Sequence, residues 1–244
     1  MKLSVVIPCL NESDTIAECV GAARRTIETL GIEGEVVVAD NGSTDRSQDL
    51  ASAAGGRVVR IEAKGYGNAL DGGIRASKGE FVIMGDADGS YDFREMQRFL
   101  TKLQEGHDLV MGCRMPSGGG TIEPGAMPFL HRWLGNPMFS LLTRWWFHVP
   151  IHDVNCGMRG FTRDLYVRLD PQASGMPFAA EMVIKANLLG ASIVEVPIAF
   201  QRDGRKHSPP HLKTFRDGWQ VLWMFMTFAF RKARPRPASV QSSG

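Results

Sequence analysis

Apolar and polar positions in this chain alternate between short β-branched runs and stretches with helical periodicity. The predicted strands are Leu3–Ile7, Glu35–Ala39, Val58–Ile61, Phe81–Met84, Leu109–Gly112 and Ile193–Phe200. Helices are expected after the Asn11–Asp14 cap and at about 45–54, 67–77 and 93–105. Strands that alternate with helices predict an α/β fold, with a Rossmann-like, mostly parallel central sheet flanked by helices and joined by right-handed crossovers.

Two apolar stretches in the second half break this alternation. Residues 127–148 interleave Leu, Phe, Met and three Trp with Arg and His, and residues 219–230 are almost wholly apolar and aromatic. Each could be a buried core helix or an amphipathic helix at a membrane interface. Two such helices on one face would form an exposed patch, which favours contact with a membrane or a large apolar ligand.

Length and composition predict one globular domain. The chain has 244 residues, of which 43% are hydrophobic, and its formal net charge is +2. The basic residues stand beside apolar clusters rather than on a polar stripe, which argues against nucleic acid as a partner. The absence of an uninterrupted apolar run of membrane-spanning length predicts no transmembrane helix, and four scattered cysteines suit a reducing cytosol. The Pro/Ser/Arg-rich residues 233–244 are expected to be disordered.

The chemically most informative residues are two carboxylates that follow the strand Phe81–Met84. Asp86 and Asp88 are spaced i, i+2 and would face the same crevice at the carboxyl end of a parallel strand. This arrangement suits a hard divalent cation that carries a diphosphate, although an acidic turn closing an ordinary strand is the alternative. An EF-hand calcium loop is excluded, because Tyr91 and Gln97 stand where it requires Gly and Glu.

Further polar residues follow the neighbouring strands. Asn11 and Glu12 follow the first strand and Asp40 the second, so all these side chains should converge on one rim of the sheet. Asp40 could accept hydrogen bonds from uracil or guanine. Its alternative role is to cap the next helix, for which Ser43 or Asp45 is better placed.

Four motifs together resemble family 2 glycosyltransferases with the GT-A fold. They are Val-Val-Ile-Pro-Cys-Leu-Asn-Glu at 5–12, Ala-Asp-Asn-Gly-Ser-Thr-Asp at 39–45, Gly-Asn-Ala-Leu at 67–70 and Asp-Ala-Asp at 86–88. The resemblance implies a single GT-A domain over 1–232, with a nucleotide-sugar half (1–112) and an acceptor half (113–232). It implies Mg²⁺ or Mn²⁺ on Asp86 and Asp88. The nucleotide-binding residues that it implies are Pro8, Leu10, Asn11, Glu12, Asp40, Gly67, Asp86 and Ala87.

In the second half, residues 153–161 resemble the acceptor-side turn of the polyprenyl-phosphate branch of this family. The resemblance implies that Asp153 and Arg159 face the cleft, although a hairpin-like turn is the alternative. It also places Glu181 near the sugar hydroxyls, where the acid could instead favour the helix dipole. In dolichyl-phosphate mannosyltransferases a basic loop matching 201–211 closes on phosphates; otherwise it would be a solvated loop. The Gly-rich segment 117–120 would suit a mobile active-site loop.

The expected function is that of an inverting, metal-dependent glycosyltransferase. The sugar would pass from a UDP- or GDP-sugar to a polyprenyl phosphate, with the enzyme in the cytoplasm or peripheral on the inner face of the membrane. The expected catalytic residues are Asp88, Asp153, Arg114 and Arg132. The expected acceptor and phosphate-binding residues are Arg114, Arg132, Arg159, Glu181, Arg202, Arg205, Lys206 and His211. The alternatives are a soluble, phosphorylated acceptor and a nucleotidyltransferase-like protein, although Cys9–Glu12 lacks the glycine-rich phosphate loop that the latter uses.

Overall fold

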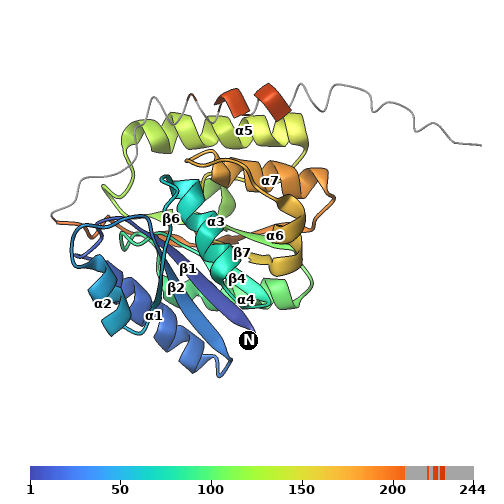
Figure 1. Ribbon diagram of the computed structural model, residues 1–244. Coiled ribbons are helices and arrows are strands. Elements are labelled where there is room, and N and C mark those ends of the chain that lie inside the picture. Colours follow the sequence, from blue (N-terminus) through green and yellow to red (C-terminus); the bar gives the residue numbers. More distant parts are fainter. Residues whose placement is uncertain (207–218, 220–221, 225, 229–244) are drawn as a thin grey trace, which may run out of the picture.

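One large sheet organises the chain (Figure 1). The computed structural model describes residues 1–206, 219, 222–224 and 226–228. Neighbouring strands lie in the order β3-β2-β1-β4-β7-β5-β8, and each pair is parallel except the two that involve β7. The strands are β1 (Leu3–Cys9), β2 (Gly34–Asp40), β3 (Arg57–Arg60), β4 (Phe81–Met84), β5 (Leu109–Cys113), β7 (Arg159–Thr162) and β8 (Ile193–Pro197).

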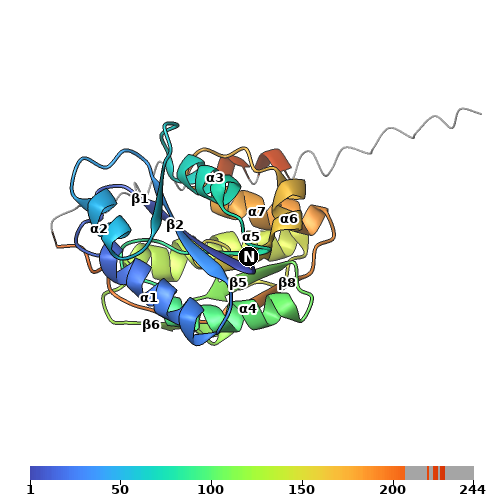
Figure 2. The same cartoon turned by 60° about the horizontal axis from the view of Figure 1, so that its bottom comes forward.

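Helices cover both faces of this sheet, as Figures 1 and 2 show. One face carries α1 (Ile16–Thr29), α2 (Ser47–Ala53) and α4 (Met96–Gln104). The other carries α3 (Tyr66–Ala76), α5 (Asn136–Phe147), α6 (Arg163–Leu169) and α7 (Phe178–Leu188). Because strand side chains alternate, β1 supplies both cores: Val5 and Ile7 pack on the first face and Val6 on the second.

The main departure from the predicted strands is β7. The sequence pattern predicts a turn across 153–161, whereas Arg159–Thr162 forms an antiparallel strand between β4 and β5. Arg-Gly-Phe-Thr has no apolar run, and its ladder partners lie far away in the sequence, so local periodicity carries no signal for it. Met84 and Met111 flank Arg159 from either side. The loop before β7 therefore reaches the edge at which β4 and β5 end.

Two smaller differences concern the strand ends. The predicted strand Ile193–Phe200 is divided into β8 and β9 (Ala199–Phe200), and β9 pairs with β6 (Thr121–Ile122). The segment 117–120, predicted to be a mobile loop, overlaps a 3₁₀ helix over Pro116–Gly118 and leads into β6. The helix predicted at 93–105 also begins with a 3₁₀ turn, Phe93–Glu95, before α4.

The first apolar stretch of the second half is helical. A wide π-helical turn, His131–Gly135, runs into α5, whose Phe139 and Phe147 are buried in the second core. In the second stretch, residues 219, 222–224 and 226–228 are helical. Among the described helices, none is long and apolar enough to cross a membrane. The predicted disordered tail, 233–244, lies outside the described residues.

Candidate active site

The predicted acidic rim forms where β1, β2 and β4 end. The parallel register sets Cys9 opposite Asp40, and Val6 opposite Met84 on the other side of β1. Asn11 and Glu12 follow β1 directly, and Asp86 and Asp88 follow β4. Three neighbouring parallel strands therefore deliver their polar residues to the same edge of the sheet.

Asp86 is held in place by two neighbours. The Tyr66 hydroxyl donates a hydrogen bond to Asp86 Oδ1 at 2.8 Å. The other oxygen, Oδ2, lies against the backbone of Gly157, so close that a Cβ on Gly157 would come within 2.6 Å of it. The pKa of Asp86 is raised to about 6, mainly because the carboxyl is buried and secondly because the Asp88 charge repels it. Two carboxylates crowded in this way form a site that a cation would stabilise.

Asp88 and Glu12 share the guanidinium of Arg205. Arg205 Nη1 lies 3.2 Å from Glu12 Oε1, and Nη2 lies 3.8 Å from Asp88 Oδ2, while Asp203 forms a further ion pair with the same group. Burial nevertheless raises the pKa of Glu12 to about 7. The loop that carries Arg205 is fixed to the acidic turn, because Gly204 N donates to the Asp88 carbonyl at 2.8 Å. The structure thus brings one of the predicted basic-loop residues to the carboxylates that are predicted to hold the metal.

Asp40 and Asn11 join the first two loops. The fully buried Asp40 carboxylate accepts hydrogen bonds from the amides of Gly42 and Ser43 and from the Gln48 side chain. Asn11, with a positive φ of 56°, accepts a bond from Thr44 N on its side-chain oxygen. Asp40 therefore braces the turn after β2. Asp45, one of the two residues predicted to cap the next helix, accepts a hydrogen bond from the amide of Ser47, the first residue of α2. Of the other predicted nucleotide-binding residues, Gly67 and Ala87 are buried at the same edge.

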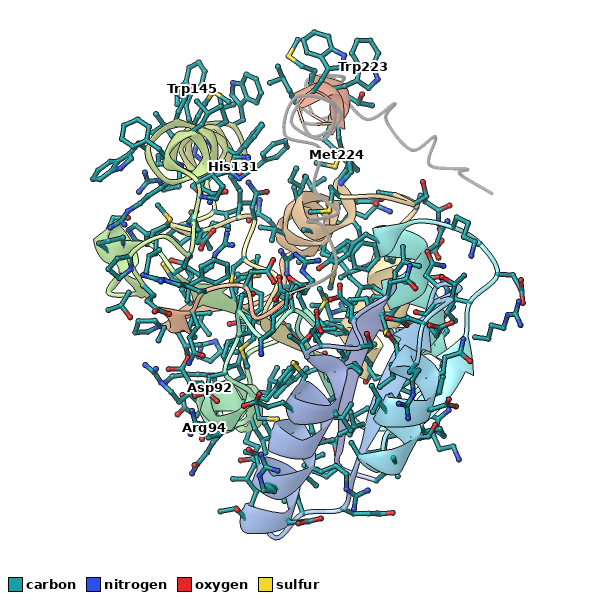
Figure 3. All side chains as sticks on the ribbon, turned by 90° about the vertical axis from the view of Figure 1, so that its left-hand side faces the viewer. Asp92, Arg94, His131, Trp145, Trp223 and Met224 are labelled. Carbon is teal, nitrogen blue, oxygen red and sulfur yellow. The ribbon has the colours of Figure 1, made fainter. Side chains whose placement is uncertain are left out.

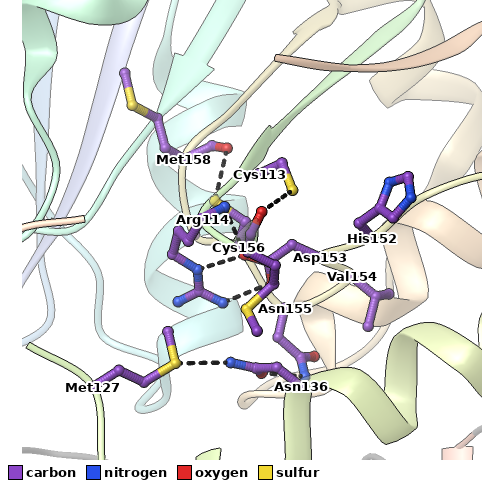
Figure 4. Close-up of polar contacts among 12 residues, drawn as sticks. Cys113, Arg114, Met127, Asn136, His152, Asp153, Val154, Asn155, Cys156 and Met158 are labelled. Carbon is purple, nitrogen blue, oxygen red and sulfur yellow. Dashed lines mark hydrogen bonds and ion pairs between the residues drawn. The ribbon is translucent and has the colours of Figure 1, made fainter. Parts of the chain in front are cut away.

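A buried ion pair, Arg114 with Asp153, lies on the side of the rim that is predicted to take the acceptor (Figure 4). Asp153 binds the Arg114 guanidinium through both oxygens, at 2.7 and 2.8 Å, and also accepts from Arg114 N. The guanidinium of Arg114 also lies over the Phe200 ring, with 5.1 Å from Cζ to the ring centroid. Glu195 accepts from the amides of His152 and Asp153, which fixes the loop before β7. Arg114 and Asp153 are thus brought together as predicted residues of one site.

Arg159 does not face a cleft, contrary to the prediction. Its side chain is fully buried and donates to the main-chain carbonyls of Val154, Cys156 and Ala179. These three carbonyls accept the hydrogen bonds of the guanidinium. Arg159 therefore holds the loop at 154–156 and the start of α7 together.

Glu181 has a similar structural role. Its buried carboxylate accepts from the amides of Gln172 and Ala173 and pairs with Lys185 at 2.7 Å. The anchored segment contacts α3, because the carbonyl of Ser174, which follows Ala173, accepts from Asn68 N. Glu181 therefore positions a loop beside α3, in addition to any favourable interaction with the helix dipole.

The remaining predicted basic residues lie further out. Arg132, in the π-helical turn, stacks over the Trp133 ring, with 5.4 Å from the guanidinium carbon to the centroid. Arg202 is exposed and donates to the Pro124 carbonyl, and Lys206 is exposed beside Asp14. His211 lies outside the described residues.

Comparison with known proteins identifies the family. The sequence model of the family described as "Glycosyl transferase family 2" matches residues 4–169. The dolichyl-phosphate hexose transferase of Haloferax volcanii is 32% identical over 200 residues, which make up 82% of each chain. The chain belongs to glycosyl transferase family 2.

Two further similarities bear on this glycosyltransferase. The low-salt glycan biosynthesis hexosyltransferase Agl6 of H. volcanii is 39% identical over 220 residues, 89% of this chain but 51% of Agl6, so the chain spans about half the length of that relative. Glucosyl-3-phosphoglycerate synthase from Mycobacterium tuberculosis, crystallised with Mn²⁺, UDP-glucose and phosphoglyceric acid, matches with a TM-score of 0.74 at 21% identity. The match covers 94% of this chain and 80% of that one. The predicted GT-A fold is confirmed.

The glycosyltransferase site also contains residues that the motifs did not single out. Tyr66 stands directly before the Gly67–Leu70 motif, and Gly157 lies inside the acceptor-side segment, so both were adjacent to recognised patterns. Tyr91 follows Asp88 by three residues, but no motif gave it a role. Its hydroxyl accepts from Gly157 N at 2.8 Å and lies 3.4 Å from Arg114 Nη1. Tyr91 thus links the backbone beside Asp86 to the Arg114–Asp153 pair, and only the folded structure shows this contact.

The carboxylates fit a divalent cation. Among the described residues there is no cluster of three or more His, Cys, Asp or Glu side chains with metal-binding geometry. Asp86 and Asp88 can nevertheless supply two oxygens, and Mg²⁺ or Mn²⁺ is commonly held by one or two carboxylates, with water and substrate phosphates as the other ligands. Burial and the neighbouring Asp88 charge raise the pKa of Asp86, and a cation beside the two carboxylates would favour its charged form.

Proposed function

We propose that this enzyme is an inverting glycosyltransferase that moves a hexose from a UDP- or GDP-sugar to a polyprenyl phosphate. One observation carries the proposal: a crowded carboxylate pair, Asp86 and Asp88, lies on the same rim as the buried Arg114–Asp153 pair. The carboxylate pair suits a cation on the donor diphosphate, and the arginine suits an anionic acceptor. Family membership leaves the nucleotidyltransferase alternative without support.

The proposed donor side depends on Asp86 and Asp88. A Mg²⁺ or Mn²⁺ ion bound there would neutralise negative charge on the departing diphosphate. Tyr66 and the backbone at Gly157 fix the orientation of the Asp86 carboxylate. Arg205, already beside Asp88, would bring a second positive charge from the 201–206 loop.

The proposed acceptor side needs no strong general base. A phosphate oxygen is already ionised near neutral pH, so the main difficulty is to hold two anions close together. Arg114 is fixed by Asp153 and stacked on Phe200, so its guanidinium is preorganised at this position. Attack from the face opposite the diphosphate would invert the anomeric centre.

A second candidate is transfer to a soluble, phosphorylated acceptor. It is favoured by the structural likeness to glucosyl-3-phosphoglycerate synthase, which was crystallised with phosphoglyceric acid. The lipid is preferred because the dolichyl-phosphate hexose transferase is more similar in sequence, at 32% identity against 21%, and because α5 exposes a long apolar face.

The proposal is tested by product analysis on a matrix of donors and acceptors with Mn²⁺ or Mg²⁺. UDP-glucose, UDP-N-acetylglucosamine and GDP-mannose are each combined with undecaprenyl phosphate, dolichyl phosphate or 3-phosphoglycerate. We expect a polyprenyl-phosphate sugar of inverted anomeric configuration from one donor. A product only with 3-phosphoglycerate would establish the second candidate, and no transfer to any phosphate acceptor would contradict both.

The close approach at Gly157 gives a separate prediction. In Gly157→Ala the new Cβ would meet Asp86 Oδ2 at 2.6 Å and the Tyr91 hydroxyl at 3.1 Å, so the carboxylate must move. We expect binding of Mn²⁺–UDP, measured by calorimetry, to weaken about tenfold or more, because metal sites need well-fixed ligands. Gly21→Ala is the control, since its Cβ would meet only the flexible end of Arg25. Equal affinity in the two variants would show that Asp86 does not hold the metal.

A further inference from the structure

The outer face of α5 and the turn before it exposes large apolar side chains. Trp145 is 68% exposed and Trp133 64%, and their aromatic and aliphatic neighbours on the same stretch are similarly open to solvent. The exposed residues are Phe129, Leu130, Trp133, Leu134, Met138, Leu141 and Trp145. Successive members from Leu130 onward are mostly four or three residues apart, so they form one continuous stripe along the helix. This stripe is called the aromatic face below.

The carboxy-terminal helical residues extend this face. Trp219, Trp223 and Met226 are exposed, whereas Leu222, Met224 and Phe228 pack against the second core. Figure 3 shows Trp145 and Trp223 projecting from the same side of the molecule, with Met224 turned inward. An exposed patch of this extent is unusual for a surface that stays in water.

The ionisable side chains on the stretch that carries the aromatic face are all basic. Residues 127–150 contain Arg132, Arg144, His131 and His148 but no Asp or Glu. Arg144 and His148 are exposed, and Arg132 stacks on Trp133. Tryptophan beside arginine, without acidic residues, is the composition that suits the headgroup region of an anionic bilayer. A second copy of the chain would instead bring the same positive charges together.

The inner side of the same helix touches the acceptor loop. Asn155 Nδ2 donates to Asn136 Oδ1 at 3.1 Å, and Val154 N donates to Ser140 Oγ at 3.2 Å. These residues directly follow Asp153, the partner of Arg114. Whatever binds the aromatic face would therefore be separated only by α5 from the loop that contains Asp153.

We infer that the aromatic face docks this glycosyltransferase on a lipid bilayer with anionic headgroups. The Trp side chains enter the interface, the arginines contact lipid phosphates, and α5 lies in the plane of the bilayer. The inference adds the bilayer as a partner of the enzyme. The biological purpose of docking rests on the proposed lipid acceptor, but docking itself requires neither donor nor acceptor.

Docking is tested by flotation of the full chain with vesicles, without any sugar nucleotide or prenyl phosphate. We expect strong binding to vesicles of phosphatidylcholine with 30% phosphatidylglycerol and weaker binding to phosphatidylcholine alone. Trp133→Ser with Trp145→Ser should lower the partition coefficient at least tenfold. Arg144→Gln should lower it about fivefold on the anionic vesicles only. The control is Val167→Ser, on α6, because Val167 is also exposed (71%) but lies outside the aromatic face.

Three results would overturn the inference. They are no flotation with either vesicle, equal loss in the Val167 control, and a stable dimer in sedimentation that the tryptophan substitutions dissociate. Failure of the proposed function is distinguishable from these, because an enzyme that transfers only to 3-phosphoglycerate could still float. Circular dichroism of each variant checks folding, and neither tryptophan is a buried core residue.

Discussion

Replacement of Asp88 by alanine is expected to abolish sugar transfer at every concentration of Mn²⁺. Asp88 is one of two carboxylates proposed to hold the metal, and its Oδ1 is positioned by the amide and the hydroxyl of Ser90, at 2.9 and 2.6 Å. Without Asp88 the cation that would neutralise the leaving diphosphate loses one of its two proposed ligands. We therefore expect kcat/KM to fall by about 10³-fold or more, because electrostatic and metal stabilisation commonly supply several kcal/mol. The measurement is initial-rate transfer with the donor and acceptor that the product analysis selects.

Two further variants serve as comparisons for Asp88→Ala. Asp88→Asn keeps the shape and the acceptor oxygen for Ser90 but removes the charge, so it should be nearly as inactive as Asp88→Ala. Asp49→Ala removes an exposed carboxylate from α2 and should leave the rate unchanged. If Asp88→Ala retained wild-type turnover, the proposed metal site would be wrong.

Replacement of Asp153 by asparagine is expected to damage both stability and activity. Arg114 is buried and paired with Asp153 through both carboxylate oxygens, so removing the negative charge leaves a buried guanidinium uncompensated. Breaking such a pair costs about 3–5 kcal/mol of unfolding free energy. We expect that loss in urea denaturation, together with a fall of about 10²-fold or more in kcat/KM.

A double substitution separates the two effects. Arg114→Met with Asp153→Leu removes both charges and fills similar volume, so a large part of the lost stability should return. Transfer should not return, because no guanidinium remains to bind the acceptor phosphate. A double variant that recovered activity along with stability would show that the pair is only a structural element of the fold.

The amino-terminal half was largely predictable from the sequence. The strand Phe81–Met84 was predicted with its actual bounds, and the other three parallel strands were predicted to within one or two residues. Their signals are local, because each is an apolar, β-branched run next to a polar loop. The sheet rule then placed Glu12, Asp40, Asp86 and Asp88 on one rim without knowledge of any contact.

The carboxy-terminal half was less predictable because its contacts join distant parts of the chain. The antiparallel strand Arg159–Thr162 has no alternating pattern, and its position between β4 and β5 depends on both neighbours. Arg159 and Glu181 looked like ligand-binding charges, but main-chain groups inside the fold take up their hydrogen bonds. A charged residue type does not reveal whether its partner is a ligand or a carbonyl.

The sequence by itself determined the parallel half of the sheet, the carboxylates at its edge and the family resemblance, because each is encoded by residues adjacent in the chain. The tertiary structure alone decided which arginines reach that edge. Arg205 lies beside Asp88, although 117 positions separate them in the sequence, and Arg114 pairs with Asp153. Arg159 is instead buried in the interior. The tertiary structure also decided that the tryptophans of α5 face outward, since one side of the helix packs on the core and the other has no covering element among the described residues.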